Sequence, residues 1–419
     1  MSGHQEYKKP AFELSMLVYD TRYRSTSFQV IALIIFFTFV WWLINNTMSN
    51  LAISGKDIDF SFLVNESNYD INQKLLEYDS RSTHGRAAVL GVLNTLVLSL
   101  VGCITATILG VFVGISRLSS NWIIARVMTI YIEIFRNVPL LLWILLVMSM
   151  VAHSFPRPKS FRGAEPDATM KIFDSVALTN RGFYIPEPLF SNGFGDLGFF
   201  SNSFYISLDL MAILAILAAS IWAAGKVKKR AKHIQEETGI RPTTWYIRLA
   251  LIFIPTILLL MYLGFYLGYP ELKGFNFKGG IHLRNSLIAL WIALSLYTSA
   301  FIGEIVRSGI LAVSKGQTEA AGSLGIKPNV IMALVILPQA LRVIVPPLIS
   351  NYLNLTKNSS LAIAVGYMDL TGTLMGITLN QTGRELETLL LGMSIYLCIS
   401  LMISAVINWY NRRNDMVER

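Results

Sequence analysis

The chain has 419 residues, of which 53% are hydrophobic and only 15% carry a charge. A soluble protein of this length would carry charge on about a quarter of its residues, so the composition excludes an ordinary soluble domain. The net charge of +9 is compatible with a nucleic-acid partner, but the basic residues lie between apolar blocks, which is typical of orientation in a membrane. We therefore expect a lipid bilayer and no nucleic acid as partner.

The apolar residues come in blocks of roughly 20, the length that crosses a bilayer as a helix. Cys103 and Cys398 each lie inside such a block, where a thiol behaves as a small hydrophobic side chain. The five histidines are scattered, and none has a neighbour at metal-ligand spacing. No G-x-x-x-x-G-K-[ST] phosphate loop occurs in the sequence. The sequence predicts no metal, no cofactor and no catalytic residue, and ATP can drive this protein only through another chain.

The first apolar block, Phe28–Ile44, follows 27 polar residues. A cleaved signal peptide is the alternative, but the leading segment is long, the block ends in Trp41-Trp42 and the cleavage site is weak. We expect a retained span with a cytoplasmic N-terminus, followed by an outer loop over residues 45–86.

The second span, Ala87–Ile115, carries Gly110 and Gly114 four residues apart. Small residues at this spacing allow a neighbouring helix to approach closely. The next block, Trp122–Val151, is interrupted by Glu133, Arg136, Asn137 and Pro139. Each charge exposed to lipid would cost roughly 2.5–3.5 kcal/mol, although Glu133 and Arg136 are spaced to neutralise each other on one helix face.

Two further spans, Tyr205–Ala224 and Trp245–Leu267, lie between outer loops at 152–203 and 268–283. The basic run Lys226–Lys232 joins them, which places that loop inside. Neither span carries an intramembrane charge or an amide cluster, the usual marks of a translocation path. We expect this hairpin at the lipid-facing periphery, and the competing hypothesis is that it lines the path.

The last three spans are Asn285–Ile310, about Val330–Ile349, and Leu389–Trp409. A mixed outer segment, Leu361–Thr388, precedes the last one, and we expect a short helix within it that lies in the membrane interface. Between the sixth and seventh spans lies a short, polar loop that contains Gln317, Glu319, Ala320, Ala321 and Gly325 and runs on to Leu337-Pro338-Gln339-Ala340.

This loop resembles the EAA loop of ABC importer permeases, in the variant of the polar amino-acid uptake family (histidine/glutamine type). Three further places match that family, although Asn137 stands where glycine is usual, and together the matches cover about half of the chain. The three further places are the pair Arg136 and Pro139, the stretch Tyr297 to Arg307, and the stretch Lys357 to Ser360. Pro338 belongs to the match at the EAA loop.

The resemblance implies an all-α integral membrane protein of about eight transmembrane helices. It implies a type I ABC importer permease core with an extra N-terminal span and an inserted helical hairpin. The architecture is closest to the first permease of general L-amino-acid or glutamate/glutamine/aspartate/asparagine importers. We divide the chain into 1–83 (tail, extra span, outer loop), 84–153 (first part of the core), 154–283 (insertion) and 284–419 (second part of the core).

The resemblance also implies partners: a cytoplasmic ABC ATPase subunit that receives the EAA loop, a periplasmic amino-acid-binding protein, and a second permease subunit in a heterodimer. The location would be the bacterial inner membrane, with both termini cytoplasmic. A bundle that carries a zwitterion needs polar groups facing a cavity near mid-membrane. The candidates are Asn94, Thr95, Tyr297, Ser299 and Glu304. Glu304 has an alternative role as the ion-pair partner of Arg307, one turn further on.

Two other functions remain open. An ion-gradient-driven amino-acid carrier would need intramembrane carboxylates and often inverted repeats, and the sequence has few of the former and no convincing repeat. A membrane anchor or sensor would recruit partners through the basic run Lys226–Lys232. Only the importer hypothesis predicts a stoichiometric ATPase subunit.

Overall fold

The computed structural model describes residues 16–55, 57–163, 166–199, 204–240 and 242–414. Its chain divides into two units, residues 1–60 and 61–419. The first unit contains α1 (Met16–Tyr19) and α2 (Thr21–Ile53), and the predicted span Phe28–Ile44 lies inside α2. The two ends of the chain, for which a cytoplasmic location is expected, lie outside the described residues.

Eight helices among the described residues are long and apolar enough to cross a membrane, as predicted. Several of them continue beyond the apolar blocks that the sequence shows, whereas Trp245–Tyr262 ends before the predicted Leu267. The spans are Tyr23–Ile53, His84–Arg117, Leu140–Phe161, Leu208–Thr238, Trp245–Tyr262, Asn285–Leu311, Pro328–Val365 and Glu385–Trp409.

The second unit is built around α3 (His84–Arg117) and α8 (Asn285–Leu311), which pack along each other. A Cβ on Gly110 would lie 2.6 Å from the Cβ of Ile302, and one on Gly114 would lie 2.6 Å from the carbonyl oxygen of Gly303. The prediction that these glycines allow a close helix approach is confirmed. The cluster beside this contact includes fully buried Leu290, Ala293, Leu294 and Ile302.

The predicted block Trp122–Val151 is divided into α4 (Trp122–Asn137) and α5 (Leu140–Ser154), both packed against α8. Pro139 precedes α5 and causes the break, because proline lacks an N–H group and forces Val138 into an extended conformation. Arg136 lies over the Phe301 ring, 5.5 Å from its centroid. The Nδ2 of Asn137 donates to Glu133 at 3.2 Å.

The segment from 324 to 414 completes the bundle. α11 and the segments after it pack against α3, α8 or each other, so the outer segment that we predicted at 361–388 is folded into the bundle. Asp369 is fully buried and accepts hydrogen bonds from the Gly372 N–H at 2.8 Å and the Tyr396 hydroxyl at 3.1 Å. The elements are α10 (Pro328–Ile331), η3 (Met332–Ile336), α11 (Leu337–Asn358), η4 (Ser359–Val365), η5 (Thr371–Thr378), α12 (Leu379–Thr382) and α13 (Glu385–Asn414), with η1 (Ser61–Val64) packed on α3.

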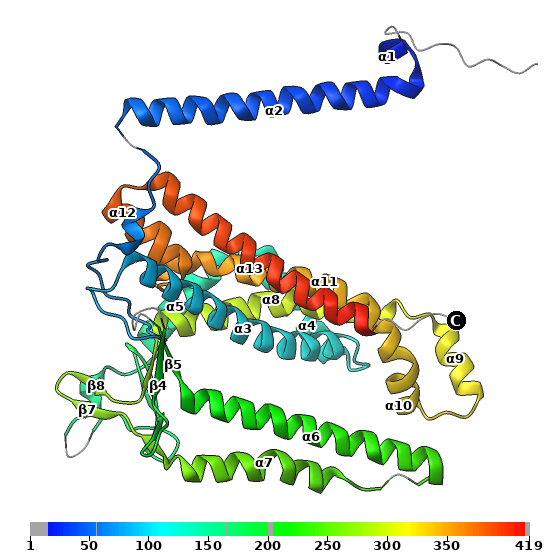
Figure 1. Ribbon diagram of the computed structural model, residues 1–419. Helices are drawn as coiled ribbons and strands as arrows, with labels where there is room; N and C mark the ends of the chain where they lie inside the picture. Colours follow the sequence, from blue (N-terminus) through cyan, green and yellow to red (C-terminus); the bar gives the residue numbers. More distant parts are fainter. Residues whose placement is uncertain (1–15, 56, 164–165, 200–203, 241, 415–419) are drawn as a thin grey trace, which may run out of the picture. The chain divides into compact units, whose positions relative to one another are not determined.

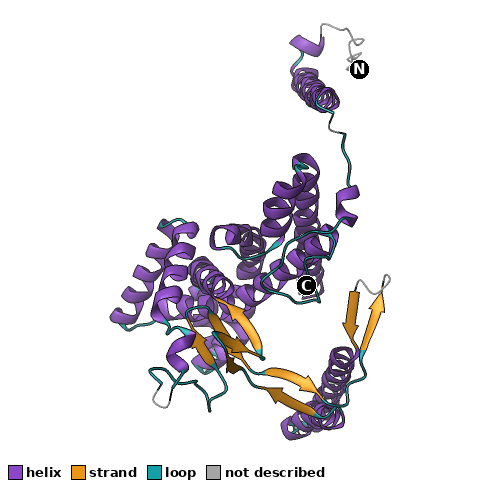
Figure 2. Cartoon of the chain, turned by 90° about the vertical axis from the view of Figure 1, so that its left-hand side faces the viewer, coloured by secondary structure: helices purple, strands orange, loops and turns teal. Residues whose placement is uncertain are grey.

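Nine short strands among the described residues lie in and beside the two outer segments that were predicted as loops. β5 and β6 occupy the outer ends of the predicted spans Tyr205–Ala224 and Trp245–Leu267, so the helices are shorter there than predicted: α6 begins at Leu208 and α7 ends at Tyr262. β2 pairs with β9 and β3 pairs with β6, so the start and the end of the insertion are joined. Figure 2 shows these strands extending from the end of the bundle toward a helix pair. The strands are β1 (Ala177–Thr179), β2 (Gly182–Ile185), β3 (Glu187–Phe190), β4 (Asp196–Phe199), β5 (Phe204–Ser207), β6 (Phe265–Gly268), β7 (Glu271–Lys273), β8 (Asn276–Lys278) and β9 (Ile281–Arg284), and η2 (Pro158–Phe161) precedes them.

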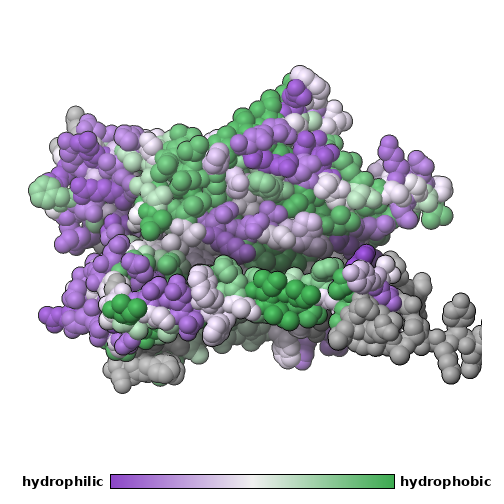
Figure 3. Space-filling model, turned by 90° about the horizontal axis from the view of Figure 1, so that it is seen from above, coloured by the Kyte–Doolittle hydropathy of each residue, from purple (hydrophilic) through white to green (hydrophobic). Residues whose placement is uncertain are grey.

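The inserted helix pair consists of α6 (Leu208–Thr238) and α7 (Trp245–Tyr262), whose main contacts are with each other and with strands β4 to β6. The basic run Lys226–Lys232 continues α6 beyond the apolar part of the helix. Figure 1 shows both helices running side by side, and in Figure 3 hydrophilic side chains gather at the left-hand end, where the strands lie.

Candidate functional site

The loop with the EAA pattern forms the nine-residue helix α9 (Lys315–Ser323), at the end of α8 away from the strands (Figure 1). Gly325 follows it at φ +73°, a left-handed conformation that suits glycine, and Pro328 then begins α10. Ala321 is buried, whereas Gln317, Glu319 and Ala320 are exposed. α9 therefore packs against its own chain on one side and leaves a small-residue surface free on the other.

Leu324, between α9 and Gly325, is 78% exposed. An exposed leucine beside alanine and glycine positions provides apolar area that a partner can bury, with little bulk around it. Pro338 lies at the start of α11, after the π-helical segment η3 that packs against α9. The predicted coupling residues thus share one end of the second unit.

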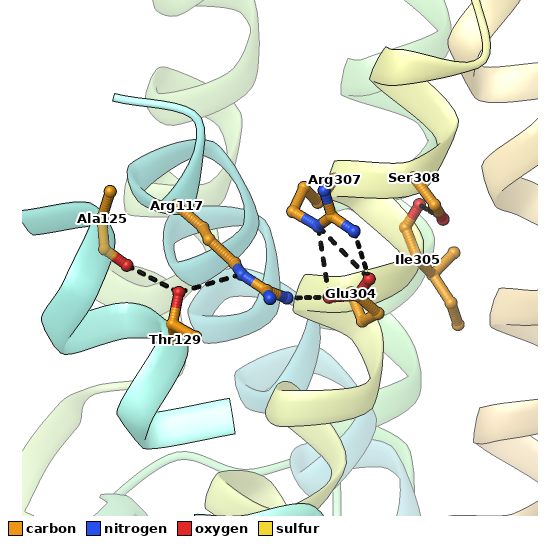
Figure 4. Close-up of polar contacts among 7 residues, drawn as sticks. All are labelled: Arg117, Ala125, Thr129, Glu304, Ile305, Arg307 and Ser308. Carbon is orange, nitrogen blue, oxygen red and sulfur yellow. Dashed lines mark hydrogen bonds and ion pairs between the residues drawn. The ribbon is translucent and has the colours of Figure 1, made fainter. Parts of the chain in front are cut away.

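Glu304 lies two turns before the end of α8 and contacts two arginines (Figure 4). Its Oε1 accepts a hydrogen bond from Arg307 Nη2 at 2.7 Å, and its Oε2 pairs with Arg117 at the end of α3. Arg117 Nε also donates to Thr129 Oγ1 on α4 at 3.2 Å. Glu304 therefore links α8 to α3, and Arg117 extends the network to α4. Its hydrogen bond with Arg307 is the alternative role considered above.

Asn94 and Thr95 are fully buried on α3, and their hydrogen bonds are to backbone groups of the chain. The Nδ2 of Asn94 donates to the carbonyl oxygens of Met368 at 2.8 Å and Gln73 at 3.0 Å. The Thr95 hydroxyl accepts from the Leu370 N–H at 3.1 Å. Both side chains hold the segment before η5 against α3.

Ser299 and Tyr297 lie on different faces of α8. Ser299 is buried, with its hydroxyl 2.7 Å from the Tyr131 hydroxyl of α4. Tyr297 lines a cavity of about 250 Å³ between α8 and α11, which we call the asparagine cavity. Its walls are Tyr297, Thr298, Phe301, Asn351, Asn354, Leu355 and Asn358.

The three asparagines follow each other at i, i+3 and i+7 and therefore share one face of α11. Amides can donate to a carboxylate and accept from an ammonium group, which suits a zwitterion. These asparagines are not among the predicted path residues, although their spacing is visible in the sequence. Of the five predicted path residues, only Tyr297 lies in this cavity. The neighbouring motif residues Lys357 and Ser360 are exposed and half-buried, respectively.

Comparisons with known proteins identify the family. Residues 244–415 match the family described as "Binding-protein-dependent transport system inner membrane component". The chain is 55% identical to the glutamate/glutamine/aspartate/asparagine transport system permease protein BztB of Rhodobacter capsulatus, over 98% of both chains. The chain belongs to this family of ABC transporter permeases. The permease is also 43% identical to the putative amino-acid ABC transporter permease protein YhdX of Escherichia coli, over 94% of this chain and 95% of that one.

A third relative is the general L-amino acid transport system permease protein AapQ of Rhizobium johnstonii, 40% identical over 96% of this chain and 95% of that one. The permease is thus a multi-pass inner-membrane component of an ABC transporter, as the motifs predicted. Permeases of this kind are not enzymes, because the ATPase activity lies in a partner subunit, and a substrate-binding protein is the other expected component. Membership of this family favours the importer over the ion-gradient-driven carrier.

Proposed function

We propose that the permease imports polar and acidic L-amino acids across the bacterial inner membrane, driven by ATP hydrolysis in a separate subunit. The observation that carries this proposal is the 55% identity, over nearly the whole length, to a permease named for glutamate, glutamine, aspartate and asparagine transport. A periplasmic amino-acid-binding protein delivers the substrate. The α9 loop, with Gln317, Glu319, Ala320, Ala321 and Gly325, docks on the ATPase through its exposed side, while Ala321 packs against the permease itself.

We further propose that the permease works as a heterodimer with a second permease subunit and that both termini are cytoplasmic. The basic run Lys226–Lys232 supports the orientation, since basic residues concentrate on the cytoplasmic side. The division at 1–83, 84–153, 154–283 and 284–419 belongs to the same proposal. The mutual packing of α6 and α7 supports a peripheral place for the inserted hairpin.

The test is reconstitution of the purified permease complex in proteoliposomes with its binding protein. We expect a stoichiometric ATPase subunit to co-purify and glutamate or glutamine uptake to require ATP. Uptake that follows an imposed proton or sodium gradient without ATP would contradict the proposal. Transport of sugars or metal ions with no amino-acid uptake would contradict the substrate class.

Within this proposal the asparagine cavity is the substrate path, and Asn94, Thr95, Ser299 and Glu304 shape the bundle around it. We expect Asn354→Leu to lower uptake about tenfold, because one lost hydrogen bond to a substrate is worth about 1–1.5 kcal/mol. The control is Ser350→Leu, an exposed position on α11 outside the cavity. The measurement is the initial uptake rate of each variant at equal permease content. Equal rates for the two variants would exclude Asn354 from the substrate path.

A further inference from the structure

A second polar cavity, of about 470 Å³, lies where the strands meet the bundle, and we call it the arginine pocket. Its volume falls in the range of about 300–1,000 Å³ that small-molecule sites occupy. Its described lining contains two arginines and four asparagines but no carboxylate. The lining residues are Asn72, Met148, Asn180, Arg181, Asn276, His282, Arg284, Asn285, Ser286, Val365 and Gly366.

The two arginines give this pocket a positive charge that no described acidic side chain neutralises. Among the described residues, the Arg181 guanidinium has only the Phe275 carbonyl oxygen as a hydrogen-bond partner, at 3.4 Å, and the buried Nε of Arg284 has none. The buried Oδ1 of Asn180 likewise has no partner in the described part of the chain. Burial lowers the pKa of His282, and this effect outweighs the hydrogen bond with the Arg181 backbone that raises it, which favours the neutral ring. The pocket therefore offers unused charge-assisted donors.

The start of α8 adds to the same charge. Arg284 is the N-cap residue of this 27-residue helix, and no side chain caps it. Asn285 and Ser286, the first two helical residues, line the pocket. The first N–H groups of a helix lack intrahelical partners and carry partial positive charge, which favours an anion beside them.

The arginine pocket is linked along the chain to the asparagine cavity. Asn358 lines the asparagine cavity and directly precedes η4, while Val365, the last residue of η4, lines the arginine pocket with Gly366. Along the chain, only the η4 residues 359–364 therefore separate the two linings. The two polar cavities are therefore neighbours along the chain.

We propose that the arginine pocket is an outer substrate site, where Arg181 and Arg284 bind the carboxylate groups of an amino acid before it passes to the asparagine cavity. The proposal rests on the proposed function and deepens it. Guanidinium groups bind carboxylates through paired hydrogen bonds. An acidic amino acid has two carboxylates and a neutral polar one has a single carboxylate, so two arginines favour the acidic substrate.

The experiment uses the complete importer complex in proteoliposomes, with saturating binding protein and radiolabelled glutamate or glutamine. We expect replacement of both arginines, Arg181→Gln with Arg284→Gln, to lower glutamate uptake at least tenfold and glutamine uptake by a smaller factor. Arg284→Lys keeps the charge but loses the paired hydrogen bonds, so it should retain more uptake than Arg284→Gln. Arg162→Gln is the matched control, since Arg162 is an exposed arginine of the same outer segment that does not line the pocket.

Two further measurements separate the possible causes. The first is the affinity of the binding protein for the double variant in nanodiscs, which should equal that for the wild type. A loss of affinity as large as the loss of uptake would overturn the proposal, because the arginines would then be contacts for the binding protein. Arg181 lies exposed in a turn, so Arg181→Gln should leave the core intact. Unchanged glutamate uptake in both the Arg181→Gln and the Arg284→Gln variant would also overturn the proposal. If the wild-type complex takes up no amino acid, the proposed function itself fails.

Discussion

Replacing Gly325 with glutamate is expected to abolish amino-acid uptake by the reconstituted importer while the permease remains folded. Gly325 has φ +73°, where a side chain costs about 1–2 kcal/mol. Nothing in the described chain lies within 4 Å of an added Cβ, so the new side chain meets open space. A complete loss of uptake would therefore come from a partner that occupies this space. The negative charge also lies at the C-terminal end of α9, where it destabilises the helix slightly.

Gly239→Glu is a matched control for this variant. Gly239 ends α6 at φ +74° and likewise has nothing within 4 Å of an added Cβ, but it lies on the inserted hairpin. Both variants carry the same backbone strain and the same charge, and only Gly325→Glu should lose uptake and release the ATPase during purification. Gly325→Asn should retain uptake, because asparagine tolerates the left-handed conformation. Normal uptake by Gly325→Glu at wild-type expression would refute α9 as the coupling element.

The spans and the α3–α8 contact could be predicted from the sequence because each depends on local information. A membrane helix needs a run of apolar residues of fixed length, and such runs are visible without knowledge of the fold. The spacing of Gly110 and Gly114 likewise places both residues on one helix face. The turn at Gly325 and Pro328 was visible for the same reason, since each residue restricts its own backbone.

The strands and the polar contacts were not predictable because they depend on residues far apart in the chain. β2 pairs with β9 across the whole inserted hairpin, and strands of three or four residues give almost no periodic signal. Asn94 is a polar residue in an apolar block, as a path residue would be, yet its amide binds the backbone of Met368. Sequence alone does not distinguish a buried amide bonded to backbone from one that faces a cavity.

Replacing Gly114 with valine is expected to prevent α3 and α8 from packing and so to destabilise the whole permease. An added Cβ would lie 2.6 Å from the Gly303 carbonyl oxygen and 2.8 Å from the Val306 Cβ. Real Cβ atoms do not approach a backbone oxygen so closely, and the carbonyl belongs to α8 itself, so the helices would have to separate. Overpacking of a tight core typically costs about 1–3 kcal/mol, and separation would disturb the buried cluster around Leu290 and Ile302 as well.

The measurement is the thermal midpoint and the monodisperse fraction of the purified complex, determined for a graded series at position 114. Gly114→Ala should lower the midpoint and Gly114→Val should lower it further, because alanine adds only the Cβ and valine adds two more carbons. The control is Gly225→Val in α6, where nothing lies within 4 Å of the added Cβ. Glycine is a poor residue inside a helix, so this control should be neutral or slightly stabilising. Equal midpoints for Gly114→Val and the wild type would show that α3 and α8 do not approach each other at this glycine.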